Sequence, residues 1–147
     1  MAEVLCQVLD KKILPGEFVQ MFHHEGHGAE AFFFGNVRNL NHGKKVLAVS
    51  YDAFVPLAEQ SFKQICTEAL EKFEQPTAVI RVIHRIGRLD VGESSIAIGV
   101  STPHRDAAYQ INRYIIEEIK KRSPIWKKEH YLSGDSEWVQ GHALCSH

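Results

Sequence analysis

The sequence contains few of the features that mark membrane, secreted or disulfide-linked proteins. Only three of its 147 residues are cysteines, and none forms a CxxC pair, which argues against a disulfide framework or a cysteine zinc site. No apolar run approaches the roughly 20 residues that a bilayer-spanning helix needs. The first residues also lack a basic segment followed by an apolar one. We therefore expect a cytoplasmic protein whose cysteines are reduced and mostly structural.

The signatures of several common enzyme classes are also absent. No GxSxG segment is present, and the glycines form neither a Walker loop nor a dinucleotide-binding fingerprint. The HHEGH segment at residues 23–27 lacks the HExxH order of zinc hydrolases, so a metal site there is disfavoured. His84 lies in an apolar segment and is interpreted as a satisfied histidine of the core rather than a catalyst. Lysine is the remaining candidate for chemistry.

The net charge of −1 is also small, but the charges are unevenly distributed. Residues 76–130 contain ten Lys and Arg against six Asp and Glu, whereas the rest of the chain contains seven against twelve. A basic region within a neutral protein favours a local anion site over a surface that binds nucleic acid along its whole length.

Hydrophobic periodicity is clear, and it predicts helices and strands in an irregular order. The strongest helical pattern of the first half is at 56–73. Strands 77–86 and 94–102 are expected to pair antiparallel across the bend GRLDVGES, and 38–45 reads as a polar loop. The other predicted elements are helices at 15–24 and 103–122, and strands at 4–9, 28–37, 45–54 and 125–132. This mixture predicts one α+β domain, residues 1–147, with a mainly antiparallel sheet.

The predicted helix at 103–122 begins in a way that suits an anionic ligand. Thr102 or Ser101 is expected to be the N-cap and Pro103 the first helical residue, so that His104 and Arg105 fall in the first turn. There the unpaired backbone N–H groups and the helix dipole favour a phosphate or carboxylate. The alternative is an ordinary surface turn without a ligand.

The end of the same helix gathers further cations. Lys120 is surrounded in sequence by Lys121, Arg122, Lys127 and Lys128. Neighbouring cations disfavour the protonated form of a lysine, which would make some neutral amine available for proton transfer or transient covalent attachment. The alternative is that these cations only complement the negative end of the helix dipole.

Five segments, in order along the chain, together resemble a known family. They are FFGNVRN (33–39), HRIGRLDVGE (84–93), STPHRDAAYQ (101–110), IKKRSPIWKKE (119–129) and GDSEWV (134–139). The family is the large, catalytic subunit of molybdopterin synthase, the MoaE family. The resemblance implies an α/β hammerhead-type fold with an additional small antiparallel β subdomain.

The resemblance also implies an activity and partners. Members are sulfurtransferases of molybdenum cofactor biosynthesis that convert cyclic pyranopterin monophosphate into the dithiolene molybdopterin. The sulfur donor is the thiocarboxylated C-terminal glycine of a small ubiquitin-like subunit, and the assembly is a heterotetramer built on a homodimer of large subunits. No metal or other cofactor is required for this step, and no nucleic acid or membrane partner is implied.

Residue by residue, the essential lysine of the family corresponds to Lys120 and its second active-site lysine to Lys127. Arg38 is implied to act on the site of the neighbouring protomer. Asn36 departs from the family pattern, in which lysine is frequent. The implied substrate-binding residues are Asn36, Val37, Arg38, His104, Arg105, Lys120, Lys127, Lys128 and Glu129.

One alternative function comes from another class. A non-catalytic module whose basic groove holds an acidic tail or nucleic acid would show the same clustered cations, and its affinity for any polyanion would fall steeply with salt. Residues 140–147 lie beyond the matched segments and are expected to form a mobile tail.

Overall fold

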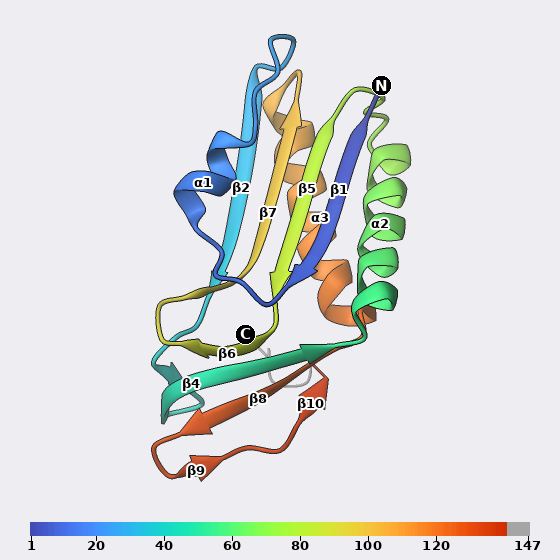
Figure 1. Cartoon of the computed structure of the whole chain (residues 1–147). Coiled ribbons are helices and arrows are strands. Elements are labelled where there is room, and N and C mark those ends of the chain that lie inside the picture. The colour runs from blue at the N-terminus through green and yellow to red at the C-terminus, as the bar shows by residue number, and fades with distance from the viewer. Residues whose placement is uncertain (141–147) are drawn as a thin grey trace.

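A four-stranded sheet packed between helices forms one end of the computed structural model, which describes residues 1–140 (Figure 1). Its strand order is β1-β5-β7-β2. The β1–β5 pair is parallel, whereas β5–β7 and β7–β2 are antiparallel. Its strands are β1 (Glu3–Leu9), β2 (Ala29–Asn36), β5 (Val79–Arg85) and β7 (Ser94–Thr102).

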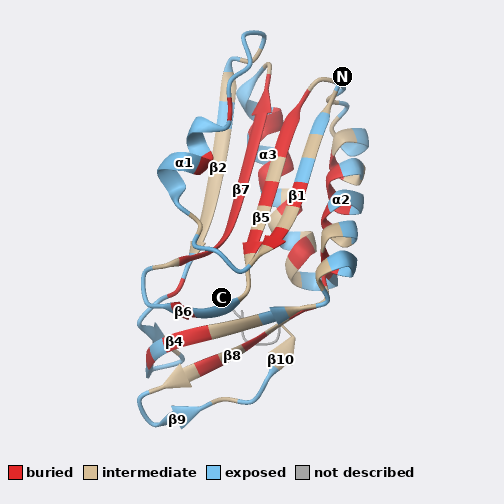
Figure 2. Ribbon diagram, in the orientation of Figure 1, coloured by how far each residue is buried: buried red, intermediate tan, exposed pale blue. Residues whose placement is uncertain are grey.

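Helices cover both faces of this sheet. Two 18-residue helices, α2 (Val55–Lys72) and α3 (Arg105–Arg122), lie side by side on one face, as Figure 1 shows. The short helix α1 (Pro15–Gln20) lies on the other face over β2 and β7. Every residue of β7 is buried, so the strand appears red along its length in Figure 2. This strand therefore lies at the centre of the hydrophobic core.

The core on the helix side forms from the apolar stripes that the sequence predicts. Ile111, Ile115 and Ile119 of α3 and Phe62 and Ile65 of α2 are all buried against the sheet. On the opposite face, Phe22 lies so close to Gly99 of β7 that a side-chain Cβ at Gly99 would overlap the Phe22 ring. Only glycine leaves room for that ring.

A second antiparallel sheet, of six strands that are mostly short, lies across one end of the first (Figure 1). Its order is β10-β8-β4-β3, with β6 paired to β4 and β9 paired to β8. The strands are β3 (Leu40–Asn41), β4 (Lys44–Ala53), β6 (Gly87–Asp90), β8 (Ile125–Tyr131), β9 (Gly134–Asp135) and β10 (Val139–Gln140). The α+β class, the mainly antiparallel pairing and the additional small β subdomain are thus confirmed.

Several local predictions were wrong. The polar loop at 38–45 contains β3, and the bend GRLDVGES contains β6, because both segments pair with β4. The helix expected at 15–24 ends at Gln20. The predicted capping of α3 also fails: Ser101 and Thr102 remain paired in the sheet, so the N-cap is His104, which makes no side-chain capping bond. Thr102 Oγ1 instead donates to the backbone oxygen of His104 at 2.6 Å.

The cysteines within residues 1–140 are free and buried. Cys6 on β1 and Cys66 on α2 lie 60 positions apart in sequence, yet their Sγ atoms are 3.9 Å apart. They fill the interface between the strand and the helix, which agrees with the structural role predicted for them, and Cys145 lies outside the described residues. The predicted mobile tail, 140–147, lies outside the described residues from position 141 onward.

Candidate functional site

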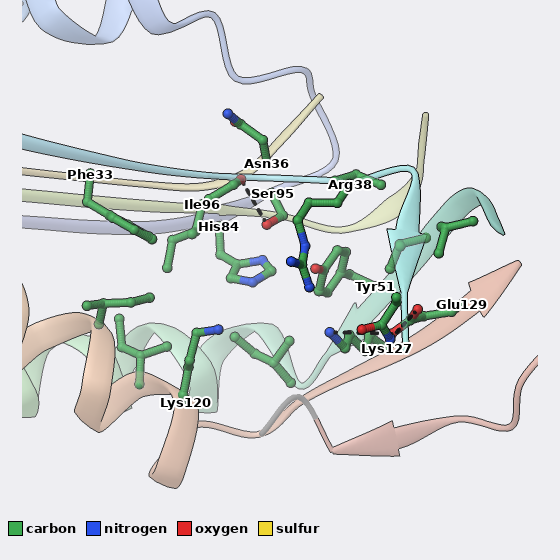
Figure 3. Close-up of a pocket in the computed structure, with 18 of the residues that line it drawn as sticks. Phe33, Asn36, Arg38, Tyr51, His84, Ser95, Ile96, Lys120, Lys127 and Glu129 are labelled. Carbon is green, nitrogen blue, oxygen red and sulfur yellow. Dashed lines mark hydrogen bonds and ion pairs between the residues drawn. The ribbon is translucent and has the colours of Figure 1, made fainter. Parts of the chain in front are cut away.

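A pocket of about 320 Å³ lies where the two sheets meet the C-terminal end of α3. Its walls come from the end of β2 and the segment after it, from β4, β5 and β7, from the last turn of α3, and from β8. Segments that are distant in sequence therefore form one cavity. Figure 3 shows side chains from both sheets and from α3 directed into it.

Three cations line this pocket. Arg38 comes from the segment after β2, Lys120 from the last turn of α3, and Lys127 from β8. Lys127 is 9% exposed and Lys120 is half-buried, so both are partly withdrawn from water. Cations at a partly desolvated cavity attract an anionic ligand more strongly than cations on an open surface. The grouping of Lys120 and Lys127 expected from the sequence is thus present in a single chain.

A buried carboxylate balances part of this charge. Glu129 is 3% exposed, and its Oε1 lies 3.7 Å from Lys127 Nζ. Asn41 Nδ2 donates to both Glu129 oxygens, at 2.9 Å each. These contacts hold the Glu129 side chain on the pocket wall and restrict the position of Lys127.

The segment that carries Asn36, Val37 and Arg38 is held by short hydrogen bonds. The Val37 N–H donates to the Glu93 backbone oxygen at 2.9 Å, and the Gly92 N–H donates to the Val37 oxygen at 2.8 Å. Asn36 Oδ1 accepts from Ser94 Oγ at 2.6 Å. All three residues line the pocket. Arg38 therefore lies in the pocket of its own chain, next to the lysines of that chain.

Lys128 faces away from the pocket, because alternate residues of β8 point to opposite sides of the sheet. Its Nζ lies 3.9 Å from Asp135 Oδ2 and 6.0 Å from the centre of the Trp138 ring. A contact between this side chain and a ligand in the pocket would require both interactions to break.

His104 and Arg105 lie at the opposite end of α3 from Lys120. Eighteen helical residues at about 1.5 Å each span about 27 Å. His104 and Arg105 are exposed and border a separate cavity with Gly28, Pro103 and Asp106. A single chain therefore does not bring the cationic pair and the lysines to one ligand.

His84 lines the pocket, which the sequence interpretation did not anticipate. It is 6% exposed, and its Nδ1–H donates to the backbone oxygen of Arg85 at 2.8 Å. Burial, helped by the nearby Lys120 charge and partly opposed by the hydrogen bond to Arg85, lowers the pKa of His84 to about 4. The imidazole is thus buried, as predicted, with Nδ1 hydrogen-bonded, but it also faces the cavity. Apolar alternation could identify its buried face but not the open space beside it.

Two other lining residues, Asn41 and Tyr51, had no signal in the sequence. Asn41 was placed in a polar loop, and Tyr51 was one aromatic residue within a predicted strand.

The histidines at 23–27 are not part of a candidate metal site. Within residues 1–140, no group of three His, Cys, Asp or Glu side chains lies close enough together to hold a metal ion. His27 Nδ1 instead pairs with Ser101 Oγ at 2.6 Å, and the His24 ring stacks on the His27 ring.

Comparisons with known proteins agree with this architecture. The profile of the family described as MoaE protein matches residues 8–122. The molybdopterin synthase catalytic subunit of Synechococcus elongatus is 46% identical over 123 residues, which is 84% of this chain and 74% of that protein. The protein of the same name from Halalkalibacterium halodurans is 39% identical over 132 residues, or 90% of this chain and 83% of that protein.

A solved structure is also similar. The crystal structure of molybdopterin synthase from Staphylococcus aureus superimposes with a TM-score of 0.82 at 36% identity, covering 90% of this chain and 95% of that one. No helix within residues 1–140 is both long and apolar enough to cross a membrane.

Proposed function

This chain belongs to the MoaE protein family, and from that membership we propose that it is the catalytic subunit of a molybdopterin synthase. It transfers sulfur from a thiocarboxylated small ubiquitin-like subunit to cyclic pyranopterin monophosphate, which produces the dithiolene molybdopterin. The observation that carries the proposal is the pocket lined by Arg38, Lys120 and Lys127, in which the buried Glu129 carboxylate pairs with Lys127.

The three cations have different roles, which follow from their positions and chemistry. Lys120 and Lys127 stabilise or protonate intermediates as the thiocarboxylate sulfur attacks the pterin, because preformed charges in a partly desolvated cavity act without reorganisation. Arg38, whose planar guanidinium suits phosphate oxygens, binds the cyclic phosphate. Glu129 keeps Lys127 in place rather than reacting itself, and Asn36 and Val37 shape the wall on which the substrate rests.

His104 and Arg105 can reach the pocket that contains Lys120 and Lys127 only from a second copy of the chain. Arg105 and Lys120 are separated by about 22 Å along α3, because fifteen residues at about 1.5 Å each lie from one to the other, so they do not share a ligand within one chain. We place them in the pocket of the partner in a symmetric dimer, in which each chain gives its lysines to one site and its helix start to the other.

The lysine assignment is tested with a matched pair of variants. The chain is mixed with thiocarboxylated small subunit and cyclic pyranopterin monophosphate, and the dithiolene product is measured. Lys120→Ala should abolish product, whereas Lys121→Ala should not, since Lys121 is exposed and pairs with Glu118 on the helix surface. Equal activity in both variants would contradict the role of Lys120. Binding of any polyanion with steep salt dependence, but no product from the unmodified chain, would favour the binding-module alternative.

The shared site is tested by complementation. We expect Lys120→Ala and Arg105→Ala chains each to be inactive alone, but exchange of subunits in an equal mixture makes half of the dimers mixed. Each mixed dimer contains one intact site, so about a quarter of the wild-type activity should return. If Arg105 served the pocket of its own chain, no activity would return.

A further inference from the structure

His84 presents an unused hydrogen-bond acceptor to the pocket. Its Nδ1–H is directed at the Arg85 backbone oxygen, which fixes the neutral tautomer with the lone pair on Nε2. Nε2 makes no hydrogen bond to any group within residues 1–140, although the side chain lines the cavity. Figure 3 shows the His84 ring and the Lys120 side chain pointing into the same space from opposite walls.

The surroundings keep this lone pair unprotonated. The aromatic rings of Tyr51 on β4 and Phe62 on α2 pack against the imidazole, with ring centres 5.1 and 6.5 Å away. Lys120 on α3 is the charged group whose field acts on it, and Arg38 adds a second cation to the same cavity. Burial and positive neighbours both oppose a further positive charge. At neutral pH, His84 can therefore accept a hydrogen bond through Nε2 but cannot donate one there.

Several polar groups of the pocket differ in what they can offer a ligand. Arg38, Lys120 and Lys127 are donors, and the Glu129 oxygens already accept from Asn41. On the wall formed by β5 and β7, Ser95 Oγ, like His84, has its proton engaged: it donates to the Gly35 oxygen at 3.2 Å. That wall therefore offers lone pairs, whereas the cations offer protons.

We propose that His84 is a specificity-determining residue whose Nε2 accepts a hydrogen bond from an N–H or O–H group of the bound ligand. The ligand is then an anion that also carries donors on the flank facing β5 and β7. This inference rests on the proposed function in identifying the ligand as a pterin phosphate, whose ring N–H and amino groups are such donors. His84 orients the heterocycle while the cations hold the phosphate.

The experiment measures binding without turnover. The dissociation constants of 6-hydroxymethylpterin monophosphate, and of counterparts methylated at ring N3 or at the exocyclic amine, are determined by calorimetry for the wild type, His84→Phe and His84→Gln. Phe preserves the ring shape without an acceptor, and Gln restores one. We expect His84→Phe to weaken binding of the parent compound about 3- to 10-fold, the value of one neutral hydrogen bond, and His84→Gln to recover part of that loss.

The decisive result is whether His84→Phe changes the effect that methylation of the ligand has on the dissociation constant. At least one methylated compound should bind the wild type more weakly than the parent does, but bind His84→Phe equally well. His130→Phe is the control: His130 points away from the pocket, with Nε2 2.7 Å from Ser50 Oγ and Nδ1 3.0 Å from Asp135 Oδ1, and this change should not alter the preference. If methylation costs the same in the wild type and His84→Phe for both compounds, the proposal is wrong.

Two further readouts separate this proposal from the catalytic one. Nitrogen NMR of the histidine side chains should show His84 neutral with its proton on Nδ1 from pH 6 to 8, and a proton on Nε2 would overturn the proposal. Product formation without the ligand coupling would leave the proposed function standing and remove His84 from recognition. Coupling between the His84 variant and ligand methylation, without product from the wild type, would support the role of His84 in recognition and contradict the proposed function.

Discussion

The contact between Asn41 and Glu129 leads to a prediction about stability. Glu129 is a buried carboxylate, and the Asn41 amide donates to both of its oxygens at 2.9 Å. A hydrogen bond to a charged group contributes about 1.5–3 kcal/mol, and removing the donor leaves the desolvated carboxylate underpaired. We expect Asn41→Ala to lower the free energy of unfolding by about 2 kcal/mol.

The assay is urea denaturation at pH 7, analysed as a double-mutant cycle with Asn41→Ala, Glu129→Ala and the double variant. The two residues should show a coupling energy of about 1.5 kcal/mol or more. Asn39→Ala is the matched control, because Asn39 is exposed and two positions away; it should change stability by less than about 0.5 kcal/mol. A coupling energy below about 0.5 kcal/mol would show that the amide does not support the carboxylate.

Other predictions concern packing and pH. Gly99→Ala should destabilise the chain by about 1–3 kcal/mol, because the new methyl group would overlap the Phe22 ring. Gly16→Ala is the control, because no atom lies within 4 Å of the added carbon. Equal melting temperatures for the two variants would contradict this packing. Arg122 donates hydrogen bonds to Glu68 and, with a further bond from Tyr114, lowers the pKa of Glu68 from 4.5 to about 2. A carboxyl group whose pKa is lower in the folded state than in the unfolded state stabilises the fold fully at a pH above its unfolded-state pKa. That contribution is lost as the pH falls toward the folded-state pKa of about 2. Glu68→Gln should therefore be less stable than the wild type at pH 6, and the difference should shrink from pH 5 to pH 3 in denaturation curves; a difference independent of pH would refute it.

The sequence predicted those elements whose signal is local. The helical stripes of α2 and α3 and the apolar strands β5 and β7 were found within a few residues of their observed bounds, because their periodicity is set by the face that each element buries. β3 and β6 were missed, since two or four residues become a strand only when β4 pairs with them. The start of α3 was misplaced because pairing in β7 keeps Thr102 extended.

The candidate site divides in the same way. Lys120 and Lys127 are close in sequence, so a turn at Ser123 brings both to one pocket. The separation of His104 from Lys120 could have been predicted from the helix length alone. Asn41 and His84 could not have been assigned to the pocket, because only the crossing of the two sheets places them on one cavity.

The parallel pairing of β1 with β5 has a consequence for how the chain folds. Glu3 lies opposite Val79, 76 positions later in the sequence, so β1 has no partner in this sheet until β5 is present. Closing so long a loop costs entropy before any contact compensates for it. We expect β1 to dock late, onto a sheet already formed by β5, β7 and β2. Substitutions in β1 should then speed unfolding more than they slow folding.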